Sequence, residues 1–291
     1  MTNDLYERLG TGTFDQPVLI LGMEGWIDAG IGAAAAMAAL LTSRETEALI
    51  RFDTDELVDH RSRRPIVRIE DGVNTGLTWP QIELRAGGDD AGRDLLFLVG
   101  PEPDLRWRAF TAAITSLAQE YSVRLVVGLG AFPAPVPHTR PVRLATTATV
   151  PELAHRVGYV NGTLDVPAGI HAALEEAFAA VGIPAVGLWA RVPHYAAAMP
   201  YPAASAALID GLVDVGGLRL DSQDLHESAA RTRVRIDELI ANSDEHRQMV
   251  AQLEAQHAQE EAAQAGLSGG IPSGDEIAAE LERYLRGEGQ G

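Results

Sequence analysis

Two proline-flanked histidines and a nearby arginine are the residues of this sequence best suited to chemistry. His138 and His194 each follow a proline, which restricts the backbone that leads into the side chain. A histidine held in this way can act as a general acid or base, or donate a hydrogen bond to an anion. Arg140, which precedes Pro141, is a natural clamp for a carboxylate or a phosphate. His138 and His194 are therefore candidate catalytic residues, and Arg140 is a candidate ligand-binding residue.

Two carboxylates lie where a buried strand gives way to an Ala-rich helix. Glu24 and Asp28 approach the N-terminus of this helix, where a nucleotide phosphate would otherwise bind the free amides. The motif Gly22-x-x-Gly25 also lacks the G-x-G-x-x-G order of a dinucleotide turn. Carboxylates here suit a sugar hydroxyl, which makes Glu24 a candidate ligand-binding residue and Asp28 a candidate catalytic residue. The alternative, which we favour, is that Asp28 only caps the helix.

Arg106 and Tyr195 complete the candidate ligand-binding residues, because each lies in a loop that follows a predicted strand. The sequence has no Gly-x-Ser-x-Gly elbow, no His-Glu-x-x-His pair and no carboxylate cluster for a metal. We expect neither a metal nor a cofactor. The alternative for the two histidines is that they satisfy backbone groups in rigid loops. We favour this alternative because no nucleophile accompanies them.

The composition excludes several classes of enzyme. The chain of 291 residues has no cysteine, and all 23 of its Lys+Arg residues are arginine. Thiolate nucleophiles, iron–sulfur clusters, zinc–thiolate sites, Walker lysines and Schiff bases are therefore excluded. Any chemistry must come from carboxylate, imidazole, guanidinium, hydroxyl or backbone groups.

The charge of the chain predicts what the protein does not bind. A formal net charge of −18 repels phosphate backbones and anionic lipids, so neither nucleic acid nor a membrane is an expected partner. No apolar stretch of roughly 18 residues, the length that spans a bilayer, occurs. The acidic start Met1-Thr2-Asn3-Asp4 lacks the order of a signal peptide. We expect a soluble, cytoplasmic protein.

The candidate residues must be positioned by an α/β domain, because short β-branched runs alternate with Ala-rich helical patterns. Strands are expected at 18–22, 49–52, 66–69, 82–85, 95–99, 124–129, 142–149 and 185–192, with 66–69 and 82–85 near a sheet edge. Helices are expected at 28–42, 105–121, 170–181 and 201–215. Ligands of open α/β sheets bind beyond the carboxyl ends of the strands. The loops that leave those ends are therefore expected to assemble one site from residues 22–30, 100–108, 130–141 and 192–195.

A change of composition near Gly216 and Gly217 divides the chain into an α/β domain, residues 1–216, and an acidic, all-helical extension, residues 217–291. Apolar residues recur at heptad spacing in the extension, at Leu225, Ala229, Thr232, Ile236 and Leu239. After a break at Asn242-Ser243-Asp244, a charged helix is expected to about Ala265. A capping box at Ser273-Gly274-Asp275-Glu276 predicts one more helix, through Ile277, Leu281 and Leu285.

Six short motifs run in order along the first domain, and as a set they are specific. They are Gly25-Trp26-x-Asp28-Ala29-Gly30, Arg64-Pro65, Trp79-Pro80, Gly100-Pro101-Glu102-Pro103-Asp104-x-Arg106-Trp107, Pro137-His138-Thr139-Arg140-Pro141 and Leu188-Trp189-Ala190-x-Val192-Pro193-His194-Tyr195. In these motifs the chain resembles the proteasome assembly chaperone 2 family, in its actinobacterial branch. The resemblance covers the region from about residue 10 to residue 216.

The resemblance implies a three-layer α/β/α fold similar to that of purine nucleoside phosphorylases, with the loops above near the pocket used there. It also implies a homo-oligomer, with a trimer as the expected form, and no established reaction. Archaeal relatives can engage the proteasome through a C-terminal hydrophobic-Tyr-x tail. This chain ends Gly289-Gln290-Gly291, and the one tyrosine of the extension is Tyr284, so docking of that kind is not expected.

Two functions remain open. The first is a chaperone-like oligomeric interaction or assembly protein, whose acidic helices contact a protein partner or its own subunits. The second is a small-molecule-binding enzyme of nucleoside phosphorylase or hydrolase type. In that enzyme a candidate arginine would hold an anion, a candidate carboxylate would hold a sugar hydroxyl, and a candidate histidine would act as acid or base. We favour the first function because the extension has a heptad stripe and the loops lack a nucleophile.

Overall fold

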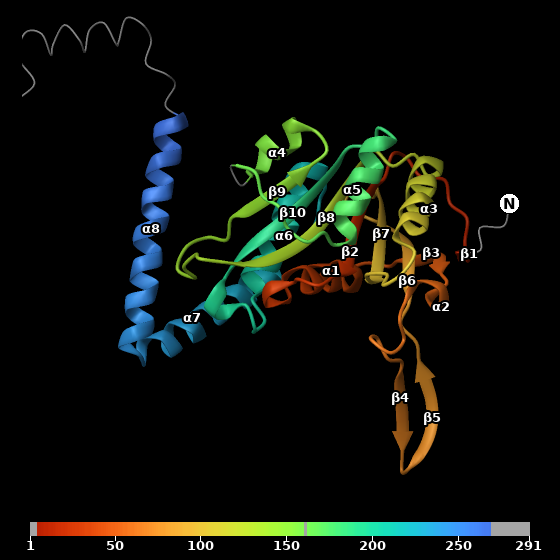
Figure 1. Ribbon diagram of the computed structural model, residues 1–291, viewed down its shortest axis with the longest axis horizontal. Helices are drawn as coiled ribbons and strands as arrows, with labels where there is room; N and C mark the ends of the chain where they lie inside the picture. The colour runs from red at the N-terminus through yellow and green to blue at the C-terminus, as the bar shows by residue number, and fades with distance from the viewer. Residues whose placement is uncertain (1–4, 160–161, 269–291) are drawn as a thin grey trace, which may run out of the picture. The chain divides into compact units, whose positions relative to one another are not determined.

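A computed structural model describes residues 5–159 and 162–268 of the chain (Figure 1). The chain divides into two compact units, Met1–Asp237 and Glu238–Gly291. The strands of the described residues are β1 (Tyr6–Arg8), β2 (Val18–Glu24), β3 (Glu47–Phe52), β4 (Ile66–Glu70), β5 (Val73–Thr78), β6 (Ile82–Gly88), β7 (Asp94–Pro101), β8 (Leu125–Ala134), β9 (Leu144–Ala148) and β10 (Ala185–Pro193). The α-helices are α1 (Gly32–Thr42), α2 (Thr54–Leu57), α3 (Trp107–Glu120), α4 (Pro151–Val157), α5 (Ile170–Ala180), α6 (Pro202–Gly216), α7 (Gln223–Ala241) and α8 (Asp244–Ser268).

One mixed sheet forms the centre of the first unit, with eight strands in the order β1-β3-β6-β7-β2-β8-β10-β9. Its four central strands, β7, β2, β8 and β10, are parallel. Antiparallel strands flank them on both sides. Long buried runs of Val, Leu and Ile are typical of parallel strands that are covered on both faces, and this is why the central strands were the easiest to predict. The predicted α/β class is confirmed.

Successive side chains of β2 show what covers each face of the sheet. Leu21 belongs to a buried cluster that includes Phe110 of α3 and Phe178 of α5. The next residue, Gly22, faces the other way, and a Cβ there would lie within 3 Å of the Met37 side chain of α1. Helix α1 packs against α6, and α3 packs against α5. The sheet therefore lies between two layers of helices.

The loop after β2 is joined to the start of α6. Gly30 has φ of 64°, and a Cβ at this position would lie 2.6 Å from Cβ of Tyr201. Its N–H donates to the carbonyl of Ala197 at 2.8 Å, and its carbonyl accepts from the N–H of Tyr201 at 2.9 Å. Only glycine satisfies both the positive φ and the close approach without strain. This joint fixes the backbone of Tyr201.

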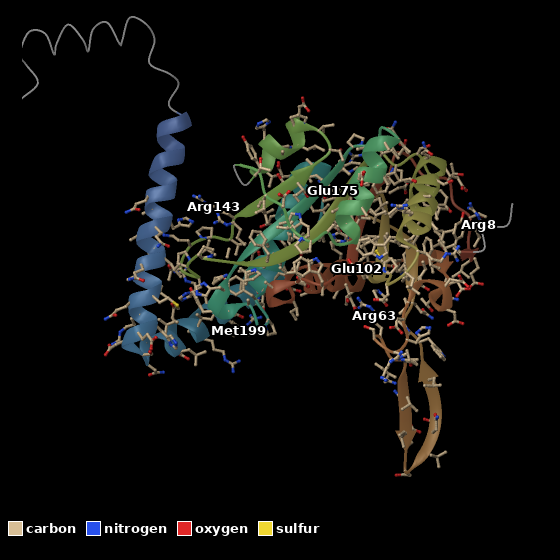
Figure 2. The ribbon with its side chains drawn as sticks, in the orientation of Figure 1. Arg8, Arg63, Glu102, Arg143, Glu175 and Met199 are labelled. Carbon is tan, nitrogen blue, oxygen red and sulfur yellow. The ribbon has the colours of Figure 1, made fainter. Side chains whose placement is uncertain are left out.

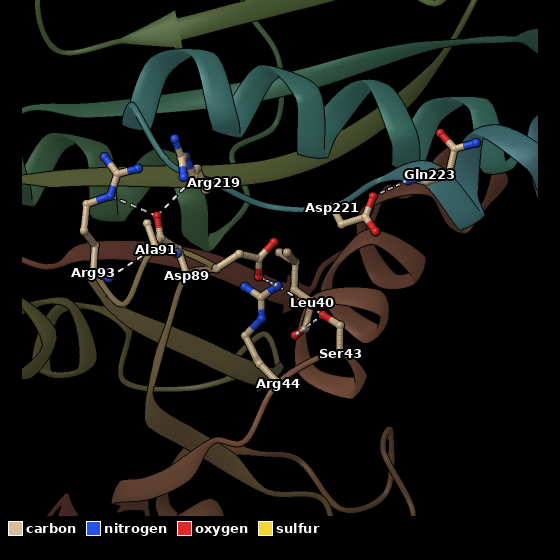
Figure 3. A network of polar contacts seen from close by, with 10 residues as sticks. Leu40, Ser43, Arg44, Asp89, Ala91, Arg93, Arg219, Asp221 and Gln223 are labelled. Atoms are coloured by element: carbon tan, nitrogen blue, oxygen red, sulfur yellow. Dashed lines mark hydrogen bonds and ion pairs between the residues drawn. The ribbon is translucent and has the colours of Figure 1, made fainter.

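A polar anchor fixes the segment that follows α6 to the turn between β6 and β7 (Figure 3). Oδ1 of Asp89 accepts from the N–H groups of Ala91 and Arg93, both at 2.9 Å. Oδ2 accepts from the N–H of Arg219 at 2.9 Å and from Nε of Arg93 at 3.0 Å. The chain that leads into α7 is therefore held in place before the helix begins.

Most predicted elements are present, and the exceptions are short or irregular. The strand at 82–85 is not near an edge, because β6 lies between β3 and β7. Pro80 misled the prediction: it precedes the strand and so removes none of its ladder hydrogen bonds. The strand at 66–69 pairs only with β5, in a separate two-stranded sheet. The elements that were not predicted are β1, β5, α2 and α4.

The predicted boundary at residue 216 coincides with the end of α6, while α7 belongs to the first unit as far as Asp237. A domain boundary at 216 stays a prediction. The heptad residues lie on α7, and the charged helix expected after Asp244 is α8. The helix expected through Ile277 lies outside the described residues. No helix of the described part of the chain has the length and apolar character to cross a membrane.

Candidate functional site

The four predicted loops contact one another: the N–H of Glu102 donates to the carbonyl of Glu24, Asp28 bridges Ala131, and His138 contacts Tyr195. Of their candidate residues, His138 and Arg140 line the pocket described below. Glu24 is exposed at the end of β2, and the exposed Arg106 forms an ion pair with Glu56 of α2. The crevice between the ends of β2 and β8 is where an open α/β sheet usually binds a ligand. Here Asp28 forms an isolated parallel bridge with Ala131 of β8, so the loop after β2 occupies that crevice.

Asp28 uses both carboxylate oxygens to cap α1. Oδ1 accepts from the N–H of Ala33 at 2.9 Å, and Oδ2 accepts from the N–H of Ala34 at 3.0 Å. Burial raises the pKa of Asp28, and these amide hydrogen bonds act in the opposite direction. The carboxylate satisfies amides of the first turn as the capping interpretation expected, but Asp28 is not the N-cap residue of α1, because Ile31 holds that position and the helix begins at Gly32. A catalytic role for Asp28 stays a prediction, and it would require the carboxylate to leave the cap.

Glu102, which sequence analysis did not select, plays a similar part in the second loop. Its Oε2 accepts from the N–H of Ile170 at 2.8 Å, at the first residue of α5 (Figure 2). A carboxylate at this point accepts a hydrogen bond from a free amide and interacts favourably with the positive end of the helix dipole. Asp28 and Glu102 therefore each hold the start of a helix, while a ligand-binding role for the exposed Glu24 stays a prediction.

His138, Tyr195 and Asp237 form a hydrogen-bonded chain that joins three distant segments. The Tyr195 hydroxyl lies 2.8 Å from the backbone N of His138 and 2.7 Å from its Nδ1. Nε2 of His138 lies 2.9 Å from Oδ1 of Asp237 on α7. All three contacts are satisfied if the hydroxyl accepts from the backbone and donates to Nδ1, while Nε2–H donates to Asp237.

This chain makes His138 a positioning residue. Its side chain is buried, and both ring nitrogens have partners. The rings of His194 and Tyr195 meet in an edge-to-face arrangement, with centroids 5.4 Å apart, and His194 itself is exposed. The structure therefore brings together the third and fourth predicted loops and adds α7. Acid–base roles for His138 and His194 stay predictions.

A pocket of about 400 Å³ lies beside this chain, between the segment after β8, the first turns of α6 and the first half of α7. Its polar lining comprises His138, Arg140, Tyr201, Asp210, His226, Thr232 and Arg233. Sequence analysis identified the first two of these but missed the others. It assigned α7 to a separate extension, and no local pattern shows which helix packs over a loop. In the described part of the chain, no group of three acidic or histidine residues could hold a metal ion.

A second feature of the first unit is the hairpin β4–β5, which extends away from the main sheet (Figure 1). Every residue of its two strands is exposed. Asp71 and Gly72 form the tip with φ of 49° and 84°, as a type I′ turn requires. Asp-Gly between β-branched runs is the strongest short signal for a hairpin. That signal could have found β5, which the prediction missed.

The hairpin exposes a set of large apolar side chains. Val67 lies opposite Leu77 across the two strands. Four apolar side chains are each more than half exposed, at Ile66, Ile69, Val73 and Leu77. A two-stranded hairpin is only marginally stable in water unless its side chains pack against something. These residues are therefore candidates for an interaction surface, which sequence analysis did not identify.

A comparison with known protein families decides the classification. The sequence matches the model of the PAC2 family over residues 22–240. The chain belongs to the PAC2 family. This confirms the resemblance that the loop motifs indicated. No curated protein matches the sequence.

Solved structures agree with this classification. A Mycobacterium tuberculosis protein of unknown function, Rv2714, is 35% identical with a TM-score of 0.84, over 91% of this chain and 92% of its own. A Corynebacterium glutamicum protein of unknown function is 30% identical with a TM-score of 0.83, over 88% of this chain and 98% of its own. The M. tuberculosis proteasome-assembly chaperone homologue Rv2125 is 33% identical with a TM-score of 0.75, over 81% of this chain and 99% of its own. The PAC2 fold thus accounts for most of the chain.

Proposed function

We propose that this PAC2 protein is a chaperone-like assembly protein that self-associates, and that the hairpin β4–β5 is its contact arm. The observation that carries the proposal is the exposed apolar surface of the hairpin. Membership of a family that includes a proteasome-assembly chaperone homologue supports the assembly role. The resemblance makes a trimer the expected form.

The energetics favour association through the hairpin. Fully burying a Val, Leu or Ile side chain contributes about 1.5–3 kcal/mol. Ile66, Ile69, Val73 and Leu77 begin more than half exposed, so covering them would release several kcal/mol. Patches of this kind on soluble proteins are typical of interaction sites.

The charge of the arm favours a second copy of this chain as the occupant. Residues 59–80 contain four arginines and three acidic residues, in a chain with a formal net charge of −18. Most surfaces of two copies repel each other, whereas this segment is close to neutral and its arginines can face acidic surface. Arg63, at the base of the hairpin (Figure 2), pairs with Asp104 at 3.8 Å. This ion pair attaches the base of the hairpin to its own domain, and the apolar strands beyond it would contact the neighbouring copy.

The test is the mass of the full-length protein in solution, measured by analytical ultracentrifugation or light scattering. The variant Ile69→Thr/Val73→Thr/Leu77→Thr keeps β-forming residues in the strands but removes apolar surface. We expect the wild type to be an oligomer and the variant to be a monomer with an unchanged circular dichroism spectrum. Val234→Thr is the matched control, because Val234 is equally exposed but lies on α7.

Two results would contradict the proposal. A monomeric wild type would exclude self-association, and an arm variant with the wild-type mass would exclude the hairpin as the contact. The enzyme of nucleoside phosphorylase or hydrolase type stays a prediction, as does the likeness of the fold to purine nucleoside phosphorylases. The described residues offer neither alternative a specific observation in its favour.

A further inference from the structure

We propose that the pocket between the segment after β8, α6 and α7 binds a small organic anion, with an oxyanion head held by Arg140 and Arg233 and an apolar body against alanines of the two helices. The proposal does not depend on self-association, because every lining residue comes from the first unit of one chain.

The pocket has the size and the lining of a small-molecule site. Its volume of about 400 Å³ falls within the usual range for ligand pockets, roughly 300–1,000 Å³. Ala203 and Ala207 line it from α6, and Ala229 and Ala230 line it from α7. Small side chains on both helices leave the space open and give it an apolar wall.

The acid of the pocket, Asp210, already accepts hydrogen bonds from its neighbours. Oδ1 of Asp210 accepts from the Ser222 hydroxyl at 2.7 Å, and Oδ2 lies 2.9 Å from Nε2 of His226. His138 is likewise occupied, by Tyr195 and Asp237. Asp210 and His138 therefore already have partners within the protein, so they do not occupy the guanidinium groups that would hold a ligand.

Two guanidinium groups remain unpaired. Within residues 5–159 and 162–268, neither Arg140 nor Arg233 has a hydrogen-bond or ion-pair partner. Both side chains are exposed, as are Arg231 and Arg235, which also form no ion pair among the described residues; what sets Arg140 and Arg233 apart is that they line the same pocket. Two permanently charged guanidinium groups at one pocket favour an oxyanion, because the paired N–H donors of guanidinium match the geometry of carboxylate and phosphate.

The hydroxyl of Tyr201 gives independent support for a ligand. Tyr201 is 4% exposed and lines the pocket, yet its hydroxyl has no hydrogen-bond partner among the described residues. Burial raises its pKa, with Tyr195 acting in the same direction and Arg233 acting against both. The group is therefore a neutral donor beside a guanidinium. The hydroxyl oxygen is accessible from the pocket and is free to donate a hydrogen bond, which the oxyanion would accept.

The test is calorimetric titration of the full-length protein at low salt with four probes: phenyl phosphate, phenylacetate, phenol and inorganic phosphate. Phenyl phosphate or phenylacetate should bind at one site per chain. Phenol and inorganic phosphate should bind at least about tenfold more weakly, since one lacks the charge and the other lacks the apolar body. The affinity of the organic anion should fall as salt is added.

Variants locate the binding. Arg140→Gln and Arg233→Gln should each weaken the organic anion about tenfold, and Tyr201→Phe should weaken it several-fold. The matched control is Arg231→Gln/Arg235→Gln. Both arginines are exposed on α7, like Arg233, but neither lines the pocket. Ala230→Leu should block the organic anions by filling the apolar part.

Three results would overturn the proposal. The first is the absence of saturable binding by either organic anion. The second is binding that survives Arg140→Gln/Arg233→Gln or is lost equally in the control. The third is inorganic phosphate binding as tightly as phenyl phosphate, which would exclude a role for the apolar wall. Because Tyr201→Phe removes a hydroxyl that makes no internal hydrogen bond, a loss of binding in that variant with an unchanged melting temperature reports on the ligand alone.

Discussion

Asp89 is a buried carboxylate and Glu175 a partly buried one, and their surroundings differ most in the supply of hydrogen-bond donors. Asp89, in the turn between β6 and β7, accepts four hydrogen bonds from backbone amides and Arg93. Glu175, on α5, accepts one, from the Thr147 hydroxyl at 2.8 Å. No ion pair involves Glu175 in the described part of the chain. The pKa values of the two acids therefore shift in opposite directions.

The pKa values express this difference. Burial acts to raise the pKa of Asp89, but the amides of Arg219, Arg93 and Ala91 and the charge of Arg93 outweigh it and lower that pKa. At Glu175 the effect of burial is larger than that of the hydrogen bond from Thr147, and the pKa is raised to about 7. Donors, rather than burial alone, thus determine which acid stays charged. The first carboxylate stabilises the fold as an anion, and the second suits the fold better when it is neutral.

The same distinction separates the arginines. Arg93 is committed to Asp89 in the anchor, whereas Arg140 and Arg233 line the pocket without a protein partner among the described residues. A charged group whose partners are all internal has a structural part to play. One that is left unpaired beside a pocket is available to a ligand.

The largest expected effect comes from Asp89→Ala. Removing the acceptor of four hydrogen bonds should lower the free energy of unfolding by about 3 kcal/mol at pH 7, because buried donors lose their partner. Chemical denaturation of full-length protein measures this change. The stabilisation is present above the unfolded pKa, near 4, and is lost as the pH falls through the lowered folded value. The deficit of the variant should therefore shrink in acid.

The control for Asp89→Ala is Asp165→Ala, since the exposed Asp165 forms no side-chain hydrogen bond or ion pair among the described residues. Its expected cost is below about 0.5 kcal/mol. Equal losses in the two variants would mean that the hydrogen-bonded turn has no special weight. That result would contradict the claim that hydrogen-bond donors make the ionised Asp89 stabilising.

Glu175→Gln should have the next largest effect, and of opposite sign. The folded pKa of Glu175 is raised from 4.5 to about 7, so wild-type stability falls as the pH rises between these values and stays low above them. Glutamine mimics the neutral acid. The variant should gain about 2 kcal/mol at pH 8, a figure reduced for the partial exposure of the side chain, and almost nothing at pH 4.5.

Melting curves at both pH values measure the gain at Glu175. Glu176→Gln is the matched control, because Glu176 is the exposed neighbour on the same helix. His171 complicates the acidic end, since burial lowers its pKa to about 4. Wild-type stability therefore also falls as the pH drops from about 6.5 to 4. The difference between Glu175→Gln and wild type cancels this contribution. A pH-independent difference would contradict the raised pKa.

The sequence was sufficient for elements that are long and buried. Runs such as Leu95–Val99 are apolar because both faces of the sheet are covered, and that cause is visible in the residues themselves. Short elements at the margins, such as α2, carry too few residues for a periodic signal. The hairpin β4–β5 was half predicted because the turn signal at Asp71 and Gly72 was not used.

The candidate site was less predictable, for a physical reason. His138 and Arg140 stand out locally because prolines flank them. Tyr201, Arg233 and Asp237 lie on helices whose packing depends on tertiary contacts that no local pattern reports. Asp28 shows the converse, since its position near a helix start predicted a capping carboxylate, and this carboxylate accepts from amides of the first turn although Asp28 is not the N-cap residue of α1.

Thr147→Val carries the smallest expected effect and tests the comparison most directly, because it removes the one hydrogen bond of Glu175. The cost should be about 1 kcal/mol at pH 8, where the ionised acid needs the donor, and less at pH 4.5. Since that bond lowers the pKa of Glu175, its loss should move the fall in stability to higher pH. In a Glu175→Gln background the pH dependence of the Thr147→Val cost should vanish, and the double-mutant cycle measures this coupling. An unchanged pH profile in Thr147→Val would mean that burial alone sets the behaviour of Glu175, and donor supply would then explain Asp89 only.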